Sequence, residues 1–259
     1  MAIHFHDERN KYSYTTRNAD EYWVDTMRDL LSGEFIQQAA DIGCGGGIYS
    51  KALCELGIPN VLGIDYSISM LEGAKENCRK YPQIKFMQGN ATALELESDQ
   101  LDLILERALI HHFSDLNSCF TEAYRVLKPG GTFVLQDRTL QNVFQGGNEE
   151  HIRGWFFACY PHLIDKEVKR RFNSRDVNIS LEEAGFEVVK ELTILEKRQV
   201  YKDKNQLLND IRKRTGRSIL HELSDVELDK LINFISARLP DQKSIIEKDY
   251  WTIWKAIKR

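Results

Sequence analysis

Short apolar runs alternate with helical segments between residues 38 and 137, and this alternation constrains the fold more than any other feature. The predicted strands are Gln38–Ile42, Asn60–Asp65, Ile84–Gln88, Leu101–Glu106 and Thr132–Asp137. The predicted helices are 20–31, 48–56, 68–80 and 115–127, with Ser67 and Ser114 as N-caps and Gly57 as a C-terminal stop. Because parallel strands need crossover connections, the alternation predicts a mostly parallel α/β sheet with helices on both faces.

The chain changes character after residue 139. The elements predicted there are a short helix over 181–184, a strand over Phe186–Tyr201, a polar helical block over Lys204–Leu239 and a final strand over Asp249–Ile257. A helical block between two strands at a sheet edge is placed either to be a substrate lid or to cover that edge as an ordinary helical pair. The sequence leaves both interpretations open.

Composition excludes several classes of protein. In 259 residues, 35 Lys and Arg stand against 39 Asp and Glu, and this net charge of −4 argues against a general duplex-DNA binder. No apolar stretch approaches the ~20 residues that span a bilayer, and the N-terminal residues do not resemble a signal peptide. The five cysteines include no C-x-x-C pair, and His4 and His6 have no third ligand nearby. We expect a cytoplasmic protein that holds no metal and binds neither nucleic acid nor a membrane.

A glycine-rich turn follows the first predicted strand. Asp41 precedes it, and Gly43, Gly45 and Gly47 lead into a helix. Glycines permit positive φ and let a ligand approach the backbone, while the start of the helix offers unpaired N–H groups. The G-x-G-x-G spacing differs from the G-x-G-x-x-G of dinucleotide-binding folds and lacks the G-K-[ST] of phosphate-binding loops. A nicotinamide-dependent oxidoreductase is therefore disfavoured.

A second acid, Asp65, ends the next predicted strand. Its carboxylate can accept hydrogen bonds from both hydroxyls of a ribose, or it can be an ordinary strand-end residue before a helix cap. The glycine loop upstream favours the ribose role.

With these motifs, the chain resembles the class I S-adenosylmethionine-dependent methyltransferases. DIGCGGG at 41–47 resembles their first motif, GIDYS at 63–67 their second, and GNA at 89–91 their third, with Asn90 in place of the usual Asp. LDLILERALIHHF at 101–113 and RVLKPGGTFVLQD at 125–137 match the fourth and fifth strand regions. The ordered resemblance covers about residues 10–140, and the closing WTIWKAIKR also fits.

The resemblance implies a doubly wound, mostly parallel, seven-stranded Rossmann-like sheet with a helical insertion near the C-terminus. The expected parts are an N-terminal helical segment (1–34), a cofactor-binding domain (35–202 and 241–259) and the insertion (203–240). The implied cofactor is S-adenosylmethionine, with S-adenosylhomocysteine as the product.

By position, the resemblance also implies a cofactor site. The loop of Gly43, Cys44, Gly45 and Gly47 would pass beneath the methionine moiety, and Asp41 would support that loop. The other implied contacts are Asp65 with the ribose, Tyr66 and Met70 with the adenine, Asn90 and Ala91 with the adenine edge, Glu106 and Arg107 with the methionine part, and Tyr14 or Arg17 with the cofactor carboxylate.

Methyl transfer from a sulfonium needs positioning more than covalent help from the protein. A base is required only when the acceptor must lose a proton, and His111 and His112 after the fourth strand are the candidates. Adjacent side chains point in different directions, so one imidazole at most is expected to face an acceptor, and we favour His111. The alternative is that one histidine packs under the cofactor while the other is exposed.

The acceptor is predicted to be a small molecule, because the chain lacks the N-P-P-Y motif of DNA amino-methyltransferases, a Pro-Cys nucleophile and the paired glutamates of arginine methyltransferases. The aromatic cluster at 155–160 is either an acceptor pocket or core. The basic runs Lys166–Arg171 and Arg212–Arg217 either meet an acidic substrate or are solvated helix faces. The predicted function is thus a small-molecule methyltransferase, and the alternative is a non-catalytic S-adenosylmethionine-binding module.

Overall fold

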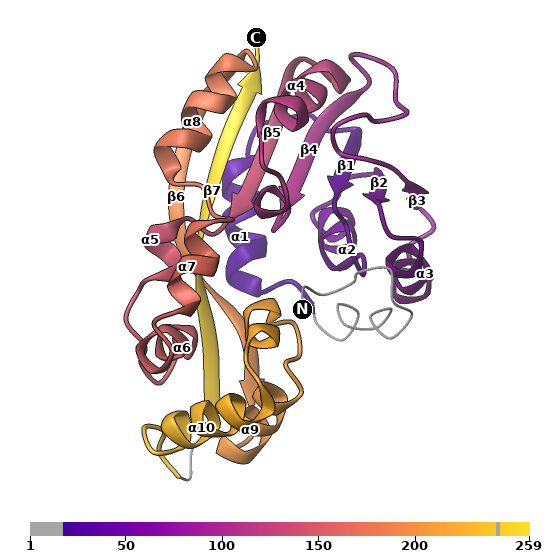
Figure 1. Cartoon of the computed structure of the whole chain (residues 1–259). Coiled ribbons are helices and arrows are strands. Elements are labelled where there is room, and N and C mark those ends of the chain that lie inside the picture. Colours follow the sequence, from indigo (N-terminus) through magenta and orange to yellow (C-terminus); the bar gives the residue numbers. More distant parts are fainter. Residues whose placement is uncertain (1–17, 242–243) are drawn as a thin grey trace. The chain divides into compact units, whose positions relative to one another are not determined.

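The computed structural model describes residues 18–241 and 244–259. Its strands are β1 (Gln38–Ile42), β2 (Asn60–Asp65), β3 (Ile84–Gln88), β4 (Leu101–Arg107), β5 (Leu127–Asp137), β6 (Phe186–Tyr201) and β7 (Ile245–Lys258). They form one seven-stranded sheet in the order β3-β2-β1-β4-β5-β7-β6 (Figure 1). Strands β1 to β5 pair in parallel, and β7 runs antiparallel to β5. The predicted fold class is confirmed.

The strand order reverses between β1 and β4. From β1 the chain moves outward to β2 and β3, and from β4 it moves the other way to β5. Such crossovers are right-handed, so the helices that follow β1 and β2 lie on one face of the sheet and the helix that follows β4 lies on the other. The connections that leave the carboxyl ends of β1 and β4 run in opposite directions, which makes this place a topological switch point. Ligands of open α/β sheets bind at that point, so the residues that follow β1 and β4 are the ones to examine.

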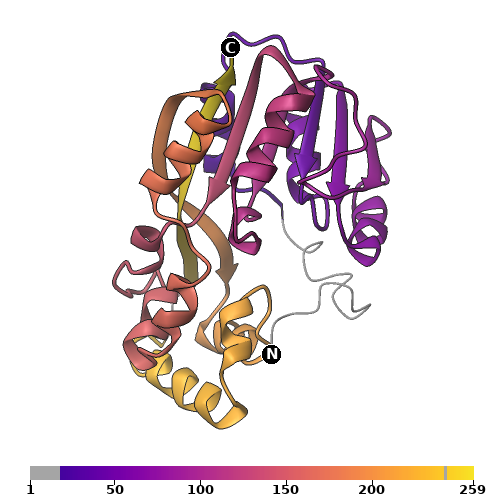
Figure 2. The ribbon, with the colours of Figure 1, turned by 45° about the horizontal axis from the view of Figure 1, so that its top comes forward.

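The helices around these strands are α1 (Glu21–Leu30), α2 (Ile48–Glu55), α3 (Ile68–Asn77), α4 (Asn117–Val126) and α8 (Ser174–Glu183), with a 3-10 turn, η2, at Ile110–His112. Helices α1 to α4 agree with their predicted ranges to within three residues at each end. Helices α4 and α8 pack side by side on one face of the sheet (Figure 2). On the other face α1 meets α2, where the Trp23 and Tyr49 rings lie 4.7 Å apart between centroids.

Two of the three predicted helix signals are confirmed, and one is wrong. Ser67 accepts a hydrogen bond from the Met70 N–H, and Gly57 ends α2 with φ of +98°. Ser114 does not cap α4, because the helix begins three residues later, at Asn117. Asp115 takes the capping role instead: its two carboxylate oxygens accept from the N–H groups of Asn117 and Ser118 at 3.2 and 3.4 Å.

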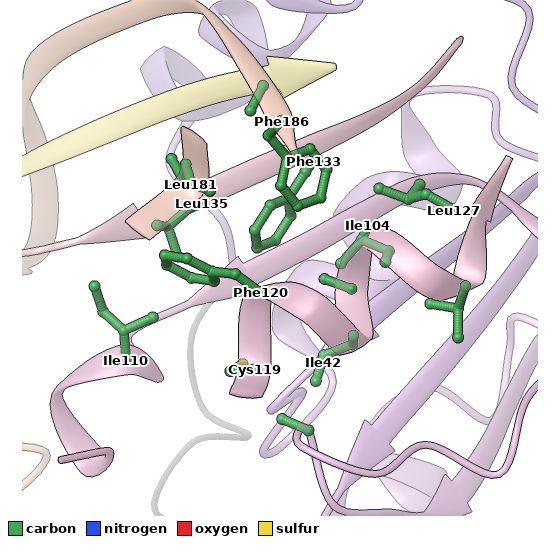
Figure 3. Packing of buried hydrophobic residues seen from close by; sticks show 14 of the residues in the cluster. Ile42, Ile104, Ile110, Cys119, Phe120, Leu127, Phe133, Leu135, Leu181 and Phe186 are labelled. Atoms are coloured by element: carbon green, nitrogen blue, oxygen red, sulfur yellow. The ribbon is translucent and has the colours of Figure 1, made fainter. Parts of the chain in front are cut away.

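The core around the sheet is built from aromatic rings contributed by distant parts of the chain. Phe133 of β5 contacts Phe120 of α4 and Phe186 of β6, with ring centroids 5.7 and 5.2 Å apart (Figure 3). Leu181 of α8 and Leu135 of β5 join the same cluster. The predicted helix at 181–184 is therefore only the end of α8, whose earlier turns are held by the buried Val177.

The described chain divides into two compact units. The sheet unit contains the described residues up to Asp137, together with 172–194 and 252–259. The helical unit contains 138–171 and 195–251. Its helices are α5 (Leu140–Val143), α6 (Arg153–Cys159), α7 (Leu163–Val168), α9 (Lys204–Arg212), η3 (Ser218–Glu222) and α10 (Asp225–Ser236). The segment predicted as an insertion, 203–240, thus shares one unit with 138–171.

The helical unit has an apolar core of its own. Phe156 of α6, Leu207 and Ile211 of α9, and Leu231 and Ile235 of α10 are completely buried in it. Trp155 and Phe157 belong to the same cluster, and Tyr160 donates to the Glu227 carbonyl at 2.9 Å. These aromatic side chains are core residues of the unit. Within the described residues, no helix is long and apolar enough to cross a bilayer.

Candidate active site

The glycine loop after β1 has the left-handed backbone that its sequence predicts. Gly43, Gly45 and Gly47 have φ of +75°, +50° and +75°. A Cβ on Gly47 would lie 2.8 Å from the Cys78 sulfur, and one on Gly43 would lie 3.0 Å from Leu109. At Gly45, by contrast, no atom of the described residues lies within 4 Å of such a Cβ. The outer glycines therefore allow tight packing, while Gly45 leaves its backbone open to a ligand.

Asp65 is brought directly against this loop. One of its carboxylate oxygens accepts from the Gly45 N–H at 2.8 Å, and the other accepts from the Ser67 N–H at 2.8 Å. The side chain is only half-buried. A carboxylate has about four acceptor positions, so this side chain can also accept from the hydroxyls of a ligand. The two motifs that the sequence singles out separately form one site.

Asp41 lies at the end of β1, just before the loop. Its carboxylate is buried and accepts a hydrogen bond from the Ser50 hydroxyl at 2.6 Å, which ties the end of β1 to the first turn of α2. Burial raises the pKa of Asp41 to about 6, and the hydrogen bonds from Ser50 oppose this shift. Cys44 is also buried, so this residue can offer a ligand only its backbone.

Two exposed apolar side chains follow Asp65. Tyr66 and Ile68 are 63% and 58% exposed, whereas Met70 is 3% exposed. Met70 lies on the inner face of α3, and its contact with the adenine stays a prediction. Ile68 was missed from the sequence, although an apolar residue at the first position of a helix, just after a functional acid, is a usable signal. Tyr66 and Ile68 are suited to cover an adenine ring.

The third motif provides a polar edge. Asn90 is exposed, and its side-chain carbonyl accepts from the Thr92 N–H and hydroxyl at 3.1 and 3.0 Å. This arrangement leaves the amide NH₂ group to donate outward. Ala91 beside it is buried. Tyr14 and Arg17, together with His4 and His6, lie outside the described residues.

Glu106 and Arg107 are the last two residues of β4, and their side chains point in opposite directions. Side chains alternate along a strand, so the Glu106 carboxyl points into the core, where the Cys119 thiol donates to it at 3.4 Å. The expected place of Glu106 beside the methionine moiety stays a prediction. Arg107 takes the other direction, and its guanidinium lies 4.1 Å from the Tyr49 ring centroid at the start of α2.

Burial raises the pKa of Glu106 from its ordinary 4.5 to about 8. Between these two pH values the folded protein keeps a proton on Glu106 that the unfolded chain releases. The corresponding contribution to stability is complete below pH 4.5 and is lost progressively as the pH rises to 8. Relative to the neutral Glu106→Gln variant, the unfolding free energy of the wild type should fall by up to about 1.4 kcal/mol per pH unit in this window. Urea denaturation from pH 5 to 9 checks this, with the exposed Glu95→Gln as the control variant. Parallel curves for wild type and Glu106→Gln would contradict it.

His111 and His112 differ in their surroundings. His111 Nδ1 lies 2.9 Å from an Asp137 carboxylate oxygen, and the His111 side chain is 12% exposed while that of Asp137 is 1% exposed. His112 is exposed, with its ring centroid 4.1 Å from that of His111. The turn that presents them begins at Ala108, which is left-handed with φ of +55° and donates to the Gln136 carbonyl at 2.8 Å. Such strain in a non-glycine residue is typical of functional turns.

Asp137 was missed from the sequence. The available signal is that β4 and β5 are neighbouring parallel strands, so their carboxyl ends lie together and an acid ending β5 can reach the turn after β4. The site in the sheet unit therefore has two parts. In the first part, the Asp65 carboxylate accepts from the Gly45 N–H. In the second part, the buried Asp137 carboxylate lies against the His111 imidazole.

Comparison with known proteins agrees with this geometry. A model of the family described as "Methyltransferase domain" matches residues 40–135. An uncharacterized methyltransferase of Synechocystis is 31% identical over 160 residues, which cover 60% of this chain and 68% of that protein. A protein described as a methyltransferase of an antibiotic biosynthesis pathway in Anabaena variabilis has the same fold, with a TM-score of 0.70 and 22% identity over 93% of this chain and 98% of that one.

The chain thus has the fold and nucleoside-binding loop of an α/β methyltransferase. It belongs to the class I S-adenosylmethionine-dependent methyltransferase family. A sterol 24-C-methyltransferase of Debaryomyces hansenii is 24% identical over 61% of this chain, which spans only 41% of that enzyme.

Proposed function

We propose that the protein transfers a methyl group from S-adenosylmethionine to a small-molecule acceptor. The observation that carries this proposal is the hydrogen bond between the Gly45 N–H and Asp65, which joins a left-handed glycine loop to a strand-end acid. The cofactor supplies a methyl group that its sulfonium already activates. The chain then has to hold the reactants in line, exclude water and, for some acceptors, remove a proton.

The residues present fit this cofactor. The open backbone at Gly45 suits the methionine part, and the half-buried Asp65 carboxylate is an acceptor type that suits ribose hydroxyls. Tyr66 and Ile68 would cover the adenine, and the Asn90 amide would face its edge. Arg107, held over Tyr49, supplies a fixed positive charge for the cofactor carboxylate.

His111 is the proposed base. In the neutral imidazole, Nδ1–H donates to Asp137, so Nε2 carries the lone pair. When an acceptor carries a proton, that proton passes to Nε2 while the acceptor atom forms its bond to the methyl carbon and the carbon–sulfur bond breaks. The Asp137 carboxylate stabilises the imidazolium that results.

Calorimetry with S-adenosylhomocysteine tests the proposed function, with NAD as the competing ligand. We expect saturable binding of S-adenosylhomocysteine and none of NAD. Binding of NAD alone would refute the proposal. Tight binding of S-adenosylhomocysteine, with no turnover across a broad panel of acceptors, would instead identify a non-catalytic binding module.

We also propose that the segment 203–240 closes over bound ligands. Because α9 and α10 share a buried core with α6, this segment is expected to move with 138–171 rather than alone. Hydrogen exchange should slow in both segments on addition of S-adenosylhomocysteine, from rates faster than those of β1 and β4. Exchange as slow as in the central strands, without a response to the ligand, would identify a static scaffold.

A cytoplasmic location is part of the proposal. All five cysteines are free thiols, and burial raises the pKa of Cys44, Cys54, Cys78 and Cys119 above the ordinary value. Unpaired thiols suit a reducing compartment.

A further inference from the structure

The helical unit buries arginines to an unusual degree. Arg153, Arg171 and Arg217 are 7%, 7% and 3% exposed. One group of them is balanced in charge: Arg198 and Arg217 donate to Glu247 at 2.9 and 2.7 Å, and Arg217 also donates to Asp210 at 2.7 Å. This group ties β6, β7 and α9 together, and we assign it a structural role.

A second group is centred on Arg153, at the start of α6. Its Nη2 donates to Glu167 at 2.8 Å, and the same buried carboxylate accepts from Arg170 and, at 2.9 Å, from Arg171. Glu167 is thus shared among three guanidinium groups. The Nε–H of Arg153 is buried and has no hydrogen-bond partner among the described residues. This side chain therefore keeps a donor for which the described residues offer no acceptor.

Unused acceptors lie in the same group. One oxygen of Asp249 accepts from Arg138 Nη2 at 2.7 Å. The other oxygen is buried, lies 3.9 Å from His151 Nδ1 and has no hydrogen-bond partner among the described residues. His151 Nδ1 lies 3.2 Å from the Lys248 carbonyl, so Nδ1 carries the hydrogen. Its Nε2 is then a bare acceptor, also buried and unpartnered among the described residues. Burial lowers the pKa of His151, which keeps this imidazole neutral.

These buried polar atoms destabilise the folded protein unless a bound ligand forms hydrogen bonds with them. A buried polar atom without a partner costs about 1–3 kcal/mol, and native proteins seldom collect several in one place. The pKa of Arg153 is lowered, because burial and the neighbouring Arg171 and Arg170 outweigh the attraction of Glu167 and Asp249. Two of the surrounding guanidinium groups reach solvent, since the side chains of Arg138 and Arg170 are 14% and 25% exposed.

We propose that Arg153, with Arg138 and Arg170, binds an oxyanion, either a carboxylate or a phosphate group of a small molecule. The Nε–H of Arg153 supplies the directed donor, and the partly exposed Arg138 and Arg170 supply further positive charge. Asp249 and His151 would accept from hydroxyl or amine groups on the same molecule. All of these residues belong to the helical unit, so this site does not rest on the proposed function. An acidic substrate was one of the two interpretations that the sequence left open for the run Lys166–Arg171.

Thermal unfolding of the full chain in sodium phosphate, sodium acetate and sodium chloride, at equal ionic strength and pH, tests the site. Phosphate or acetate should raise the melting temperature saturably, and chloride should not. Loss of a charge-assisted hydrogen bond corresponds to roughly 10- to 150-fold in affinity, so Arg153→Met should raise the apparent dissociation constant by this factor. Arg212→Met is the matched control, because Arg212 is exposed and paired with Asp229 on the surface. Whether phosphate or acetate binds more tightly identifies the class of oxyanion.

The results that would overturn the oxyanion site differ from those that would refute the proposed function. Equal responses of wild type and Arg153→Met, or stabilisation no greater than that by chloride, would overturn the proposal. If Arg153→Met fails to fold, Arg153→Lys keeps the charge without the Nε–H and should still bind about 10-fold more weakly. Binding of S-adenosylhomocysteine, whose proposed site lies in the sheet unit, serves as the folding control. Its absence in the wild type would refute the proposed function and leave the oxyanion result standing.

Discussion

Asp65→Ala should weaken the binding of S-adenosylhomocysteine by roughly 10- to 150-fold, the range for a lost hydrogen bond to a charged group. The substitution removes the proposed ribose acceptor. It also removes the carboxylate oxygen that accepts from the Gly45 N–H, so the loop loses a constraint at the same time. Isothermal titration of wild type and variant measures the effect directly, without knowledge of the acceptor.

Asp102→Ala is the matched control for this experiment. Asp102 also accepts from two backbone N–H groups, those of Gln37 and Gln38 at 2.9 and 2.8 Å, but it lies at the start of β4. The two variants therefore lose similar local hydrogen bonds at opposite ends of the parallel strands. Asp102→Ala should bind S-adenosylhomocysteine as the wild type does. Equal affinities of Asp65→Ala and wild type would remove Asp65 from the cofactor site.

Local patterns in the sequence predict the parallel half of the sheet with great accuracy. The bounds of β1, β2 and β3 agree residue for residue, because short apolar runs between glycine or polar breaks have only one way to pair in a buried parallel sheet. The glycine loop was predictable for a similar reason: positive φ at three alternating positions needs glycine, whatever surrounds it.

Contacts between residues far apart in the sequence were harder to predict. The partner of His111 is Asp137, which is 26 residues away, and only the pairing of β4 with β5 brings the two side chains together. The direction of Glu106 depends on strand phase, since a shift by one residue exchanges the core face for the ligand face. Met70 is similar, because the inner face of α3 is determined by what packs against it.

The helical unit was the least predictable part. From the sequence alone, its aromatic residues can be core or pocket, and its basic residues can be exposed or bind a ligand. Its core also joins segments that lie before and after α8 in the chain. The Arg153–Glu167 pair spans one helical connection, while Arg138 and Asp249 are 111 residues apart. Charge clusters of this kind depend on tertiary pairing, which neither spacing nor propensity encodes.

His111→Ala should lower turnover by roughly 10²- to 10⁴-fold when the acceptor must lose a proton, and should leave cofactor affinity nearly unchanged. The reason is geometric: Asp137 holds the His111 ring at 2.9 Å, while His112 is exposed. His112→Ala is the matched control and should cost little. The measurement is the rate of S-adenosylhomocysteine formation with an acceptor that turns over.

Asp137→Asn separates a base from a packing residue at this position. The asparagine keeps a polar partner for the ring but removes the negative charge that stabilises the imidazolium. If His111 is the base, the acid limb of the pH–rate profile should move to lower pH, because the unprotonated imidazole persists further into acid. Turnover should fall at the same time, since the ring is less well oriented and its charged form is less stable. Equal small losses in His111→Ala and His112→Ala, with an unchanged acid limb in Asp137→Asn, would show that the acceptor reacts as a free nucleophile.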